Sequence, residues 1–300
     1  DRIMNKPLVT IAIPTYNRAE SYLRGVIESA LAQTWQPLEI IIGDNASTDA
    51  TPQVIAGYDD PRIRHLRHAE NIGANGNFNS LLDEAAGEWF LLLHDDDLVD
   101  PTFVETCLGA QADDARYGFI RTGVRAIDSE GRVLKERSNR IPGDRPEDLY
   151  RAWFRSKIGL FLCNTLYRTD ALREIGGFHS LHYLLEDNYA LVKIMQRWAY
   201  LDVPEVLASY RYTYDQRTYQ VPVQAWCEDF RGLLELITGQ VDSASRNEIA
   251  RMGRRFFGML CVRRANAIAS PWRRTRARLT VARHFGLASL KLPWTLPSFS

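Results

Sequence analysis

The sequence of 300 residues contains no hydrophobic run that approaches the ~18 consecutive apolar residues of a membrane-spanning helix. Cysteine is scarce, and the four thiols lie far apart without any C-x-x-C pair: Cys107, Cys163, Cys227 and Cys261. This spacing is typical of buried, reduced thiols and suits a cytosolic enzyme. No secretory leader is visible at the first residues, and we therefore expect a cytoplasmic protein.

Two common phosphate-binding motifs are also absent. The chain has no G-x-x-x-x-G-K-[ST] and no G-x-G-x-x-G after its first predicted strand, which argues against the usual nucleotide-binding folds. The formal net charge is zero, with 37 basic and 37 acidic residues. Hydrophobic residues make up 45% and charged residues 25%, which is ordinary for a globular protein with a sizeable core.

The most informative feature that is present is a run of three carboxylates, Asp95, Asp96 and Asp97, directly after the apolar segment 89–94. Adjacent carboxylates repel one another, so a packed core does not hold them without a compensating charge. A divalent cation that prefers oxygen ligands is the obvious partner. The simpler alternative is a solvated turn that opens a helix after Pro101.

Strand and helix patterns alternate along the N-terminal third. Short apolar runs predict strands at residues 8–14, 38–43, 63–66 and 89–93. Between them we expect a helix with Asn17 as its cap, a short helix that ends near Gly57, and a helix over 73–86 that stops at Gly87. The apolar face of the first helix carries Leu23, Val26, Ile27, Ala30 and Leu31. This order predicts a mostly parallel sheet whose carboxyl edge carries the Asp cluster.

Seven short motifs occur in the order and spacing of one enzyme family, over roughly residues 7–215. They are Pro14-Thr15-Tyr16-Asn17-Arg18, Gly43-Asp44-Asn45-Ala46-Ser47-Thr48-Asp49, Glu70-Asn71-Ile72-Gly73, Gly87-Glu88-Trp89-Phe90, Asp95-Asp96-Asp97, Gly176-Gly177-Phe178 and Glu186-Asp187. Each motif alone is weak, and the set is specific. The chain resembles the family-2 inverting glycosyltransferases with the GT-A fold, in particular those of bacterial cell-surface polysaccharide and O-antigen synthesis.

The resemblance implies an α/β GT-A nucleotide-diphospho-sugar transferase fold. Its central sheet is expected to be mostly parallel with flanking helices, followed by a C-terminal helical extension. The catalytic domain would span residues 1–220, with the nucleotide-sugar half at about 1–100 and the acceptor half at about 101–220. Residues 221–300 would form a basic helical region.

The resemblance also assigns a donor site. Asp95 and Asp97 would hold the metal, Mg²⁺ or Mn²⁺, and Asp95 and Asp96 would contact the donor. Asp44 would accept the ring N–H of uracil or thymine, although it could instead be a turn residue that opens an Asx-type loop before Ser47. The remaining predicted contacts to the nucleotide sugar are Pro14, Thr15, Tyr16, Asn17, Arg18, Asn71, Gly73 and Asn79. Asn17 and Arg18 are equally compatible with a helix cap and a surface position.

The pair Glu186-Asp187 is expected to act on the acceptor. In the resembled family the Asp of this pair is the general base, which takes a proton from the acceptor hydroxyl as that oxygen attacks the anomeric carbon. We therefore predict Asp187 as the base and Glu186 and His182 as acceptor-binding residues. The alternative is that both carboxylates only stabilise the start of a helix.

Two departures from the family pattern affect the diphosphate. Many relatives carry an Arg-Asn pair where this chain has Phe78-Asn79, so neutral hydrogen bonds from Asn75, Asn77 and Asn79 are expected to replace an arginine. Many relatives also have a metal-binding histidine after a Tyr-Arg. Here Tyr210-Arg211 is followed by no histidine, and Arg211, Arg217 or a tyrosine would take that place.

These expectations combine into a metal-dependent, inverting, non-processive hexosyl- or deoxyhexosyl-transferase. Its donor would be a UDP- or dTDP-sugar, and its acceptor a saccharide or a lipid-linked saccharide in surface polysaccharide synthesis. Two alternatives from other classes are a nucleotidyltransferase that makes a nucleotide sugar and a catalytically inactive sugar- or nucleotide-binding protein.

The zero net charge hides an asymmetry. No acidic residue follows Glu248, while eleven basic residues do, interleaved with aromatic and apolar residues such as Trp272 and Trp294. Such a tail could lie on the anionic inner face of the plasma membrane as a peripheral protein. It could equally form helices that pack on the catalytic domain or in a homo-oligomer. Nucleic acid is not expected as a partner, because the rest of the chain is acidic.

Overall fold

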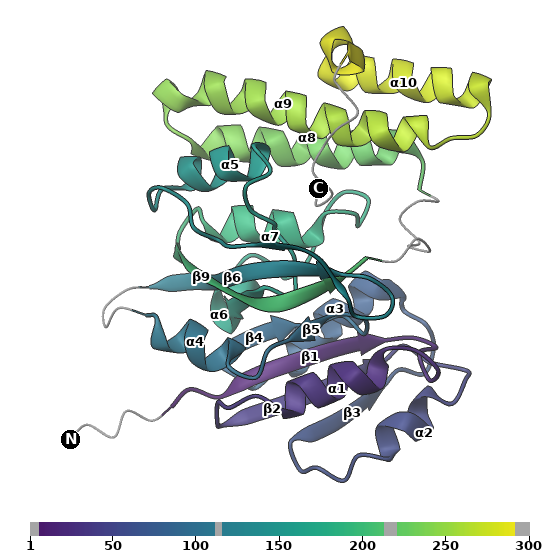
Figure 1. The fold of residues 1–300 in the computed structure, drawn as a ribbon, viewed down its shortest axis with the longest axis vertical. Helices are drawn as coiled ribbons and strands as arrows, with labels where there is room; N and C mark the ends of the chain where they lie inside the picture. The colour runs from purple at the N-terminus through teal and green to yellow at the C-terminus, as the bar shows by residue number, and fades with distance from the viewer. Residues whose placement is uncertain (1–5, 112–115, 213–220, 292–300) are drawn as a thin grey trace. The chain divides into compact units, whose positions relative to one another are not determined.

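A computed structural model describes residues 6–111, 116–212 and 221–291. The chain divides into two compact units (Figure 1). The first, here called the sheet unit, comprises Asp1–Arg140, Leu160–Phe178 and Arg197–Tyr212. The second, the helical unit, comprises Ile141–Gly159, His179–Gln196 and Thr213–Ser300.

The sheet unit is built on a nine-stranded sheet in the order β3-β2-β1-β4-β8-β6-β9-β5, with β7 paired to β6. The strands β3, β2, β1 and β4 are all parallel, whereas β8 runs antiparallel to both β4 and β6. The strands span Val9–Thr15 (β1), Leu38–Asp44 (β2), Ile63–Arg67 (β3), Trp89–Leu92 (β4), Leu98–Val99 (β5), Tyr117–Ile127 (β6), Val133–Arg137 (β7), Thr165–Arg168 (β8) and Ala199–Arg211 (β9). The four predicted N-terminal strands form one parallel block, and its strand β4 pairs with the antiparallel strand β8.

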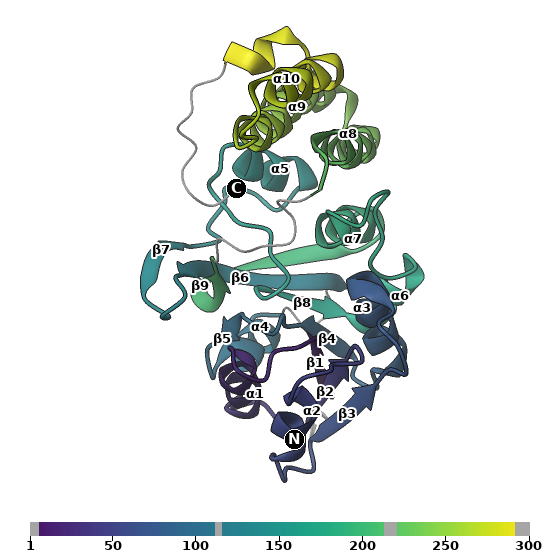
Figure 2. The same ribbon diagram turned by 90° about the vertical axis from the view of Figure 1, so that its right-hand side faces the viewer.

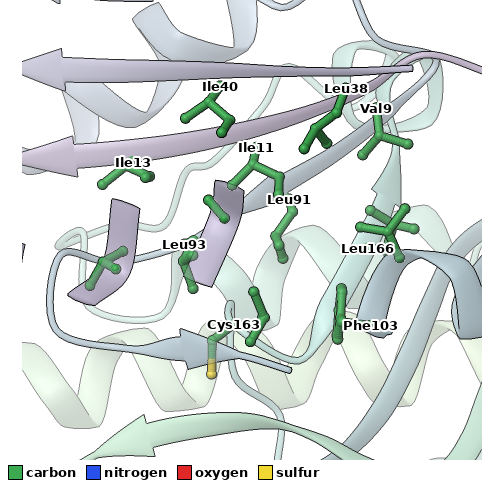
Figure 3. Packing of buried hydrophobic residues seen from close by; sticks show 14 of the residues in the cluster. Val9, Ile11, Ile13, Leu38, Ile40, Leu91, Leu93, Phe103, Cys163 and Leu166 are labelled. Carbon is green, nitrogen blue, oxygen red and sulfur yellow. The ribbon is translucent and has the colours of Figure 1, made fainter. Parts of the chain in front are cut away.

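The sheet forms because its first strands are apolar on both faces. Every residue of β1 is buried, and so is nearly every residue of β2. Parallel strands covered on both sides read as continuous apolar runs. Figure 3 shows Ile11 and Leu91 side by side in a cluster that also contains Phe103, Cys163 and Leu166. Burying each such aliphatic side chain contributes about 1.5–3 kcal/mol.

Helices of the sheet unit connect these strands. They span Leu23–Leu31 (α1), Thr51–Ala56 (α2), Gly73–Glu84 (α3), Phe103–Gly109 (α4) and Thr169–Glu174 (α6). The face predicted for α1 is buried at Leu23, Val26, Ile27 and Ala30. The prediction that Asn17 caps this helix is wrong, because α1 begins at Leu23 with Tyr22 at the cap position. Asn17 instead adopts a left-handed backbone with φ of 55°.

The helical unit contains Pro146–Phe154 (α5), Glu186–Ile194 (α7), Val223–Gln240 (α8), Ser243–Asn266 (α9), Pro271–Phe285 (α10) and the 3₁₀ turn Leu287–Lys291 (η2). The helices α8, α9 and α10 lie side by side in both views (Figures 1 and 2). Their core is aromatic: Phe257 stacks on Phe230 with ring centroids 4.7 Å apart and meets Phe154 edge-on at 5.4 Å. Within the described residues, no helix combines the length and apolar character needed to span a membrane.

Candidate active site

Several residues predicted to bind the nucleotide-sugar donor lie at or just after the carboxyl ends of the parallel strands. In register, Thr15 at the end of β1 pairs with Asp44 at the end of β2, and Asp44 pairs with Arg67 at the end of β3. The chain leaves β4 just before His94 and the Asp cluster, and Leu93 N still donates to Ala12 O on β1. Open α/β sheets bind ligands at this edge, because the loops that follow parallel strands meet there.

Asp44 is fully buried and uses its two oxygens differently. Oδ1 accepts a hydrogen bond from Ser47 N at 2.8 Å, so the Asx-type loop considered for this residue is present. Oδ2 accepts no hydrogen bond from the described residues, and lies 3.5 Å from His65 Nε2 and 3.6 Å from Arg67 Nε. A buried acceptor left without a donor costs free energy, and the ring N–H of a uracil or thymine is a suitable donor.

Two loops at this edge are fixed by polar contacts. Asn17 Oδ1 accepts from Thr48 N at 2.8 Å, and Asn17 N donates to Ser47 Oγ at 2.9 Å. Asn45 Nδ2 donates to Asn71 Oδ1 at 2.9 Å and to Gly73 O at 3.1 Å. Asn17 and Asn71 therefore order the loop backbones here, and their predicted contacts to the donor stay predictions.

The asparagines of α3 serve the protein itself. Asn79 donates to Phe178 O at 3.0 Å and accepts from Phe178 N at 2.8 Å, so both ends of its amide hold one backbone position. Gly177 adopts φ of 79°, and a side chain there would collide with Asn79 Oδ1. Asn77 donates to Gly43 O at 2.7 Å. These contacts already use both ends of the Asn79 amide. The predicted role of Asn79 in binding the nucleotide sugar stays a prediction.

The loop after β4 offers a cation-binding arrangement. One ligand atom each from His94, Asp96 and Asp97 lies within 4.8 Å of the others. His94 Nε2 is buried and has no hydrogen-bond partner among the described residues. Oxygens on opposite sides of one Mg²⁺ lie about 4.2 Å apart, so small adjustments would let these atoms share an ion. This set of ligand atoms therefore fits a divalent metal, although the sequence pointed to Asp95 and Asp97.

Asp97 is only 2% exposed. Its Oδ1 accepts from Arg211 N at 2.9 Å, and burial together with the nearby Asp96 charge holds the pKa of Asp97 well above its usual range. The charge of Arg211 opposes this shift in the pKa of Asp97 without cancelling it, and its guanidinium donates to Asp96 O and Asp128 O and lies 4.0 Å over the ring of Tyr22. A cation would supply the missing charge. Arg217, the other predicted substitute for the family histidine, lies outside the described residues.

Asp95 is balanced in another way. Arg18 Nε lies 3.3 Å from Asp95 Oδ1, and burial raises the pKa of Asp95 while the Arg18 charge opposes that shift. Arg18 and Asp95, both predicted to contact the nucleotide sugar, thus lie next to each other in the structure. The roles of Asp95 as a metal ligand and of Arg18 as a donor contact stay predictions. Pro14 and Thr15 end β1, and Tyr16 follows them in the chain.

The predicted base belongs to the helical unit, in the first turn of α7. Burial raises the pKa of Asp187 to about 6, although Asn188 N donates to its Oδ1 at 2.8 Å and lowers the pKa. No charged side chain contributes to this shift. A carboxyl group with a pKa near 6 binds protons more readily than an ordinary Asp and is still ionised at neutral pH, which suits a general base.

The loop before α7 is held by Asp229, a fully buried residue of α8. Asp229 accepts from Ser180 Oγ and His182 N, each at 2.8 Å, and from Leu184 N at 3.2 Å. The ring of His182 pairs with Glu228, whose Oε2 lies 2.6 Å from Nε2. His182, predicted to contact the acceptor, is thus also an anchor of its own loop. Its role and that of Glu186 toward an acceptor stay predictions.

Sequence reasoning missed several of these polar partners. His65 and Arg67 beside Asp44 could have been found from the strand order, because parallel neighbours end at the same edge. Asn45 belongs to the motif Gly43–Asp49, but the sequence assigns it no role. Asp229 carries no sequence signal, since a single Asp within an amphipathic helix resembles any solvated position.

Solved structures define the class of fold. The chain superimposes with a TM-score of 0.66 on Staphylococcus aureus TarS residues 1–349 in complex with UDP-GlcNAc, at 16% identity over 94% of this chain and 90% of that one. Mannosyltransferase PcManGT from Pyrobaculum calidifontis, in complex with GDP-Man and Mn²⁺, gives a TM-score of 0.57 at 18% identity over 96% and 86% of the two chains. The fold is GT-A, as the motifs predicted.

Sequence comparison gives the family. The glycosyl transferase family 2 profile matches residues 10–176, more than half of the chain, and the protein belongs to that family. It is 34% identical to the succinoglycan biosynthesis protein ExoO of Rhizobium meliloti over 43% of this chain and 36% of ExoO. It is 30% identical to the putative glycosyltransferase EpsH of Bacillus subtilis, over 56% and 49%.

A third relative names its acceptor. The chain is 34% identical to the GalNAc(5)-diNAcBac-PP-undecaprenol beta-1,3-glucosyltransferase of Campylobacter jejuni, over 45% of this chain and 43% of that protein. These matches span less than half the length of each of the three relatives.

Proposed function

We propose that this protein is a metal-assisted, inverting glycosyltransferase that moves one sugar from a nucleotide-diphosphate donor to a saccharide or lipid-linked saccharide in polysaccharide synthesis. The observation that carries the proposal is the edge of the parallel block, where Asp44 Oδ2 accepts no hydrogen bond from the described residues and one ligand atom each from His94, Asp96 and Asp97 lies within 4.8 Å of the others. A pyrimidine nucleotide with a metal-bound diphosphate would supply both partners.

In this proposal Asp44 accepts the N–H of the base through Oδ2, while Oδ1 keeps the Ser47 loop closed. UDP- and dTDP-sugars are therefore the favoured donors. Asp96 and Asp97, joined by His94 or Asp95, would hold Mg²⁺ or Mn²⁺, which neutralises the charge that develops on the leaving diphosphate. Arg18 lies at the same edge, paired with Asp95, and can reorient toward the donor because its side chain is 41% exposed.

Asp187 is proposed as the general base. Its role is to accept the proton of the acceptor hydroxyl as that oxygen attacks the anomeric carbon, in one displacement that inverts the configuration. Glu186, which precedes it in the first turn of α7, would orient the acceptor together with His182. The raised pKa of Asp187 supports this role, because a carboxylate with a pKa near neutrality is a better proton acceptor than an ordinary one.

The proposed acceptor class rests on the relatives. ExoO is named for succinoglycan biosynthesis, and the Campylobacter jejuni relative for transfer to an undecaprenol-linked saccharide. The hexosyl or deoxyhexosyl nature of the donor and the transfer of a single sugar per encounter are part of the same proposal.

The test is to incubate the full chain with a panel of UDP-, dTDP- and GDP-sugars and to measure release of the nucleoside diphosphate, with Mg²⁺, Mn²⁺ or a chelator present. Mn²⁺ binding is measured separately by electron paramagnetic resonance. Donor-dependent release that needs a metal would support the proposal. Pyrophosphate formation from a nucleoside triphosphate and a sugar phosphate would identify a nucleotidyltransferase instead, and tight donor binding without turnover a binding protein.

A further inference from the structure

Helix α10 has one face that packs and one that does not. Val281 and Phe285 are buried against the other helices. Arg274 donates to Ile268 O at 3.0 Å and Arg278 to Asn266 Oδ1 at 3.2 Å, so these arginines also face the protein. This side of α10 is a structural face, fixed by apolar burial and by hydrogen bonds.

The opposite side carries exposed apolar residues. Trp272 is 79% exposed and Leu279 is 51% exposed. With 3.6 residues per turn, positions 272, 276, 279 and 283 fall within about 60° of arc on an ideal helix. Trp272, Leu279, Arg276 and Arg283 therefore form one stripe along α10. Single exposed apolar residues are ordinary, but here a tryptophan and a leucine lie on the same side of one helix as two exposed arginines.

The charge of this stripe has a single sign. Arg273, Arg276 and Arg283 are exposed, and within residues 6–111, 116–212 and 221–291 no carboxylate or hydrogen-bond acceptor pairs with their guanidinium groups. No acidic residue occurs anywhere after Glu248. We define the outer face of α10 as Trp272, Arg273, Arg276, Leu279 and Arg283.

We propose that the outer face of α10 docks on an anionic lipid surface, with Trp272 and Leu279 entering the interfacial region and the arginines contacting lipid phosphates. Tryptophan is favoured at the membrane–water interface, and an amphipathic basic helix lies in that plane. The positive stripe complements anionic headgroups, whereas a symmetric dimer through the same face would set arginines against arginines. Lipid is therefore favoured over a second copy of the chain.

The neighbouring helix α9 is not part of this surface. Its aromatic residues Phe256 and Phe257 and its Leu260 are buried in the core of the helical unit. The two alternatives left open by the sequence, packing and membrane contact, thus apply to different helices: α9 packs, and α10 presents a free face. The inference does not depend on the proposed transferase chemistry.

The test is co-sedimentation of the full chain with vesicles of phosphatidylglycerol or of phosphatidylcholine. We expect binding to the anionic vesicles only, and release at 1 M salt, where the Debye length is about 3 Å. Reversing two charges in R276E/R283E should weaken binding by about thirty-fold or more, because loss of each arginine near the surface lowers the affinity about five-fold. W272A should weaken binding to anionic vesicles as well, because it removes the apolar contact.

The matched control is R251E/R255E, which makes the same change in net charge at exposed positions of α9. Its binding should fall by no more than about five-fold, because charges farther from the surface are screened.

Equal loss in both double variants would overturn the assignment to α10, and so would equal binding to both vesicle types. Absence of vesicle binding combined with concentration-dependent self-association that R276E/R283E abolishes would identify an interface between copies instead. Binding to RNA but not to vesicles would likewise overturn the proposal. Donor turnover in the α10 variants should match the parent protein, so failure here is distinguishable from failure of the proposed function.

Discussion

Burial raises the pKa of Asp97 at the sheet edge and that of Asp187 at the start of α7, but the two carboxylates have different neighbours. Asp97 has another carboxylate, Asp96, beside it, and both the burial and that charge raise its pKa. Asp187 has no charged neighbour that contributes, and burial alone raises its pKa to about 6. Accumulated negative charge of this kind can be balanced by a bound cation. A single desolvated carboxylate requires only a proton, which it can take and release.

The difference implies distinct consequences for the same substitution. Replacing Asp by Asn at the sheet edge removes charge that would face the proposed metal and nucleotide sugar, and so should affect the binding of both. The same replacement at Asp187 removes a proton acceptor and should leave the donor in place. The predictions below test whether the two groups of carboxylates separate in this way.

The largest effect is expected for Asp187→Asn. Loss of a general base costs ~10²–10⁴-fold in rate, and kcat should fall by that amount while the Kd for the nucleotide measured by calorimetry hardly changes. Asp170→Asn, a similar change in the first turn of α6, serves as a control for removing a helix-start carboxylate. Near-normal transfer with a collapse in donor binding would place Asp187 in the donor site. A product that retains the anomeric configuration would refute the single displacement.

Asp97→Asn should have the next largest effect, a loss of ~10²–10³-fold in kcat/KM, because stabilisation by a bound metal is worth several kcal/mol. Mn²⁺ affinity should fall in parallel. Asp95→Asn should also reduce turnover, but by less, since the Asp95 charge is already opposed by Arg18. If neither variant loses activity, or the parent protein is fully active in excess chelator, the metal assignment fails.

Asp44→Asn should weaken donor binding by roughly ten- to one-hundred-fold, because an amide can lose the acceptor that faces the base. Asparagine retains an oxygen for Ser47 N, so the loop and the melting temperature should be little changed. The informative measurement is the ratio of affinities for UDP and CDP. A ratio unchanged from the parent protein would show that Asp44 does not read the base.

Much of the sheet edge could be predicted from the sequence. Strands β1, β2 and β4 are short apolar runs, and the rule that parallel strands end at one edge brings Thr15, Asp44 and the Asp cluster together. This reasoning needs only local periodicity and the order of elements. It also predicted the buried face of α1.

Other features depend on contacts that the sequence does not encode locally. Asn17 resembled a helix cap, yet it takes a left-handed backbone to reach Thr48, and that partner is visible only once β1 and β2 are paired. Asp229 holds the loop before α7 through Ser180 and His182, which lie far away in the chain. Whether an amphipathic helix packs on one side or two depends on its neighbours, so α9 and α10 could not be distinguished by pattern.

The smallest effect concerns pH and distinguishes the two groups of carboxylates most directly. As the proposed base, Asp187 would act in its ionised form, so kcat/KM should fall about tenfold per pH unit below pH 6 and level off above it. Its pKa is raised above the ordinary 3.8, so the folded state holds this proton more tightly than the unfolded chain does. The contribution of Asp187 to stability is therefore present below about pH 4 and is lost as the pH rises through 6. Acidification from pH 6 toward 4 should reduce activity while this group favours the folded state, and Asp187→Asn should show neither dependence.

The measurement is a pair of pH profiles, kcat/KM and melting temperature, for the parent protein and Asp187→Asn. An activity loss that follows melting, or a pH profile that survives in Asp187→Asn, would assign the titration to another group.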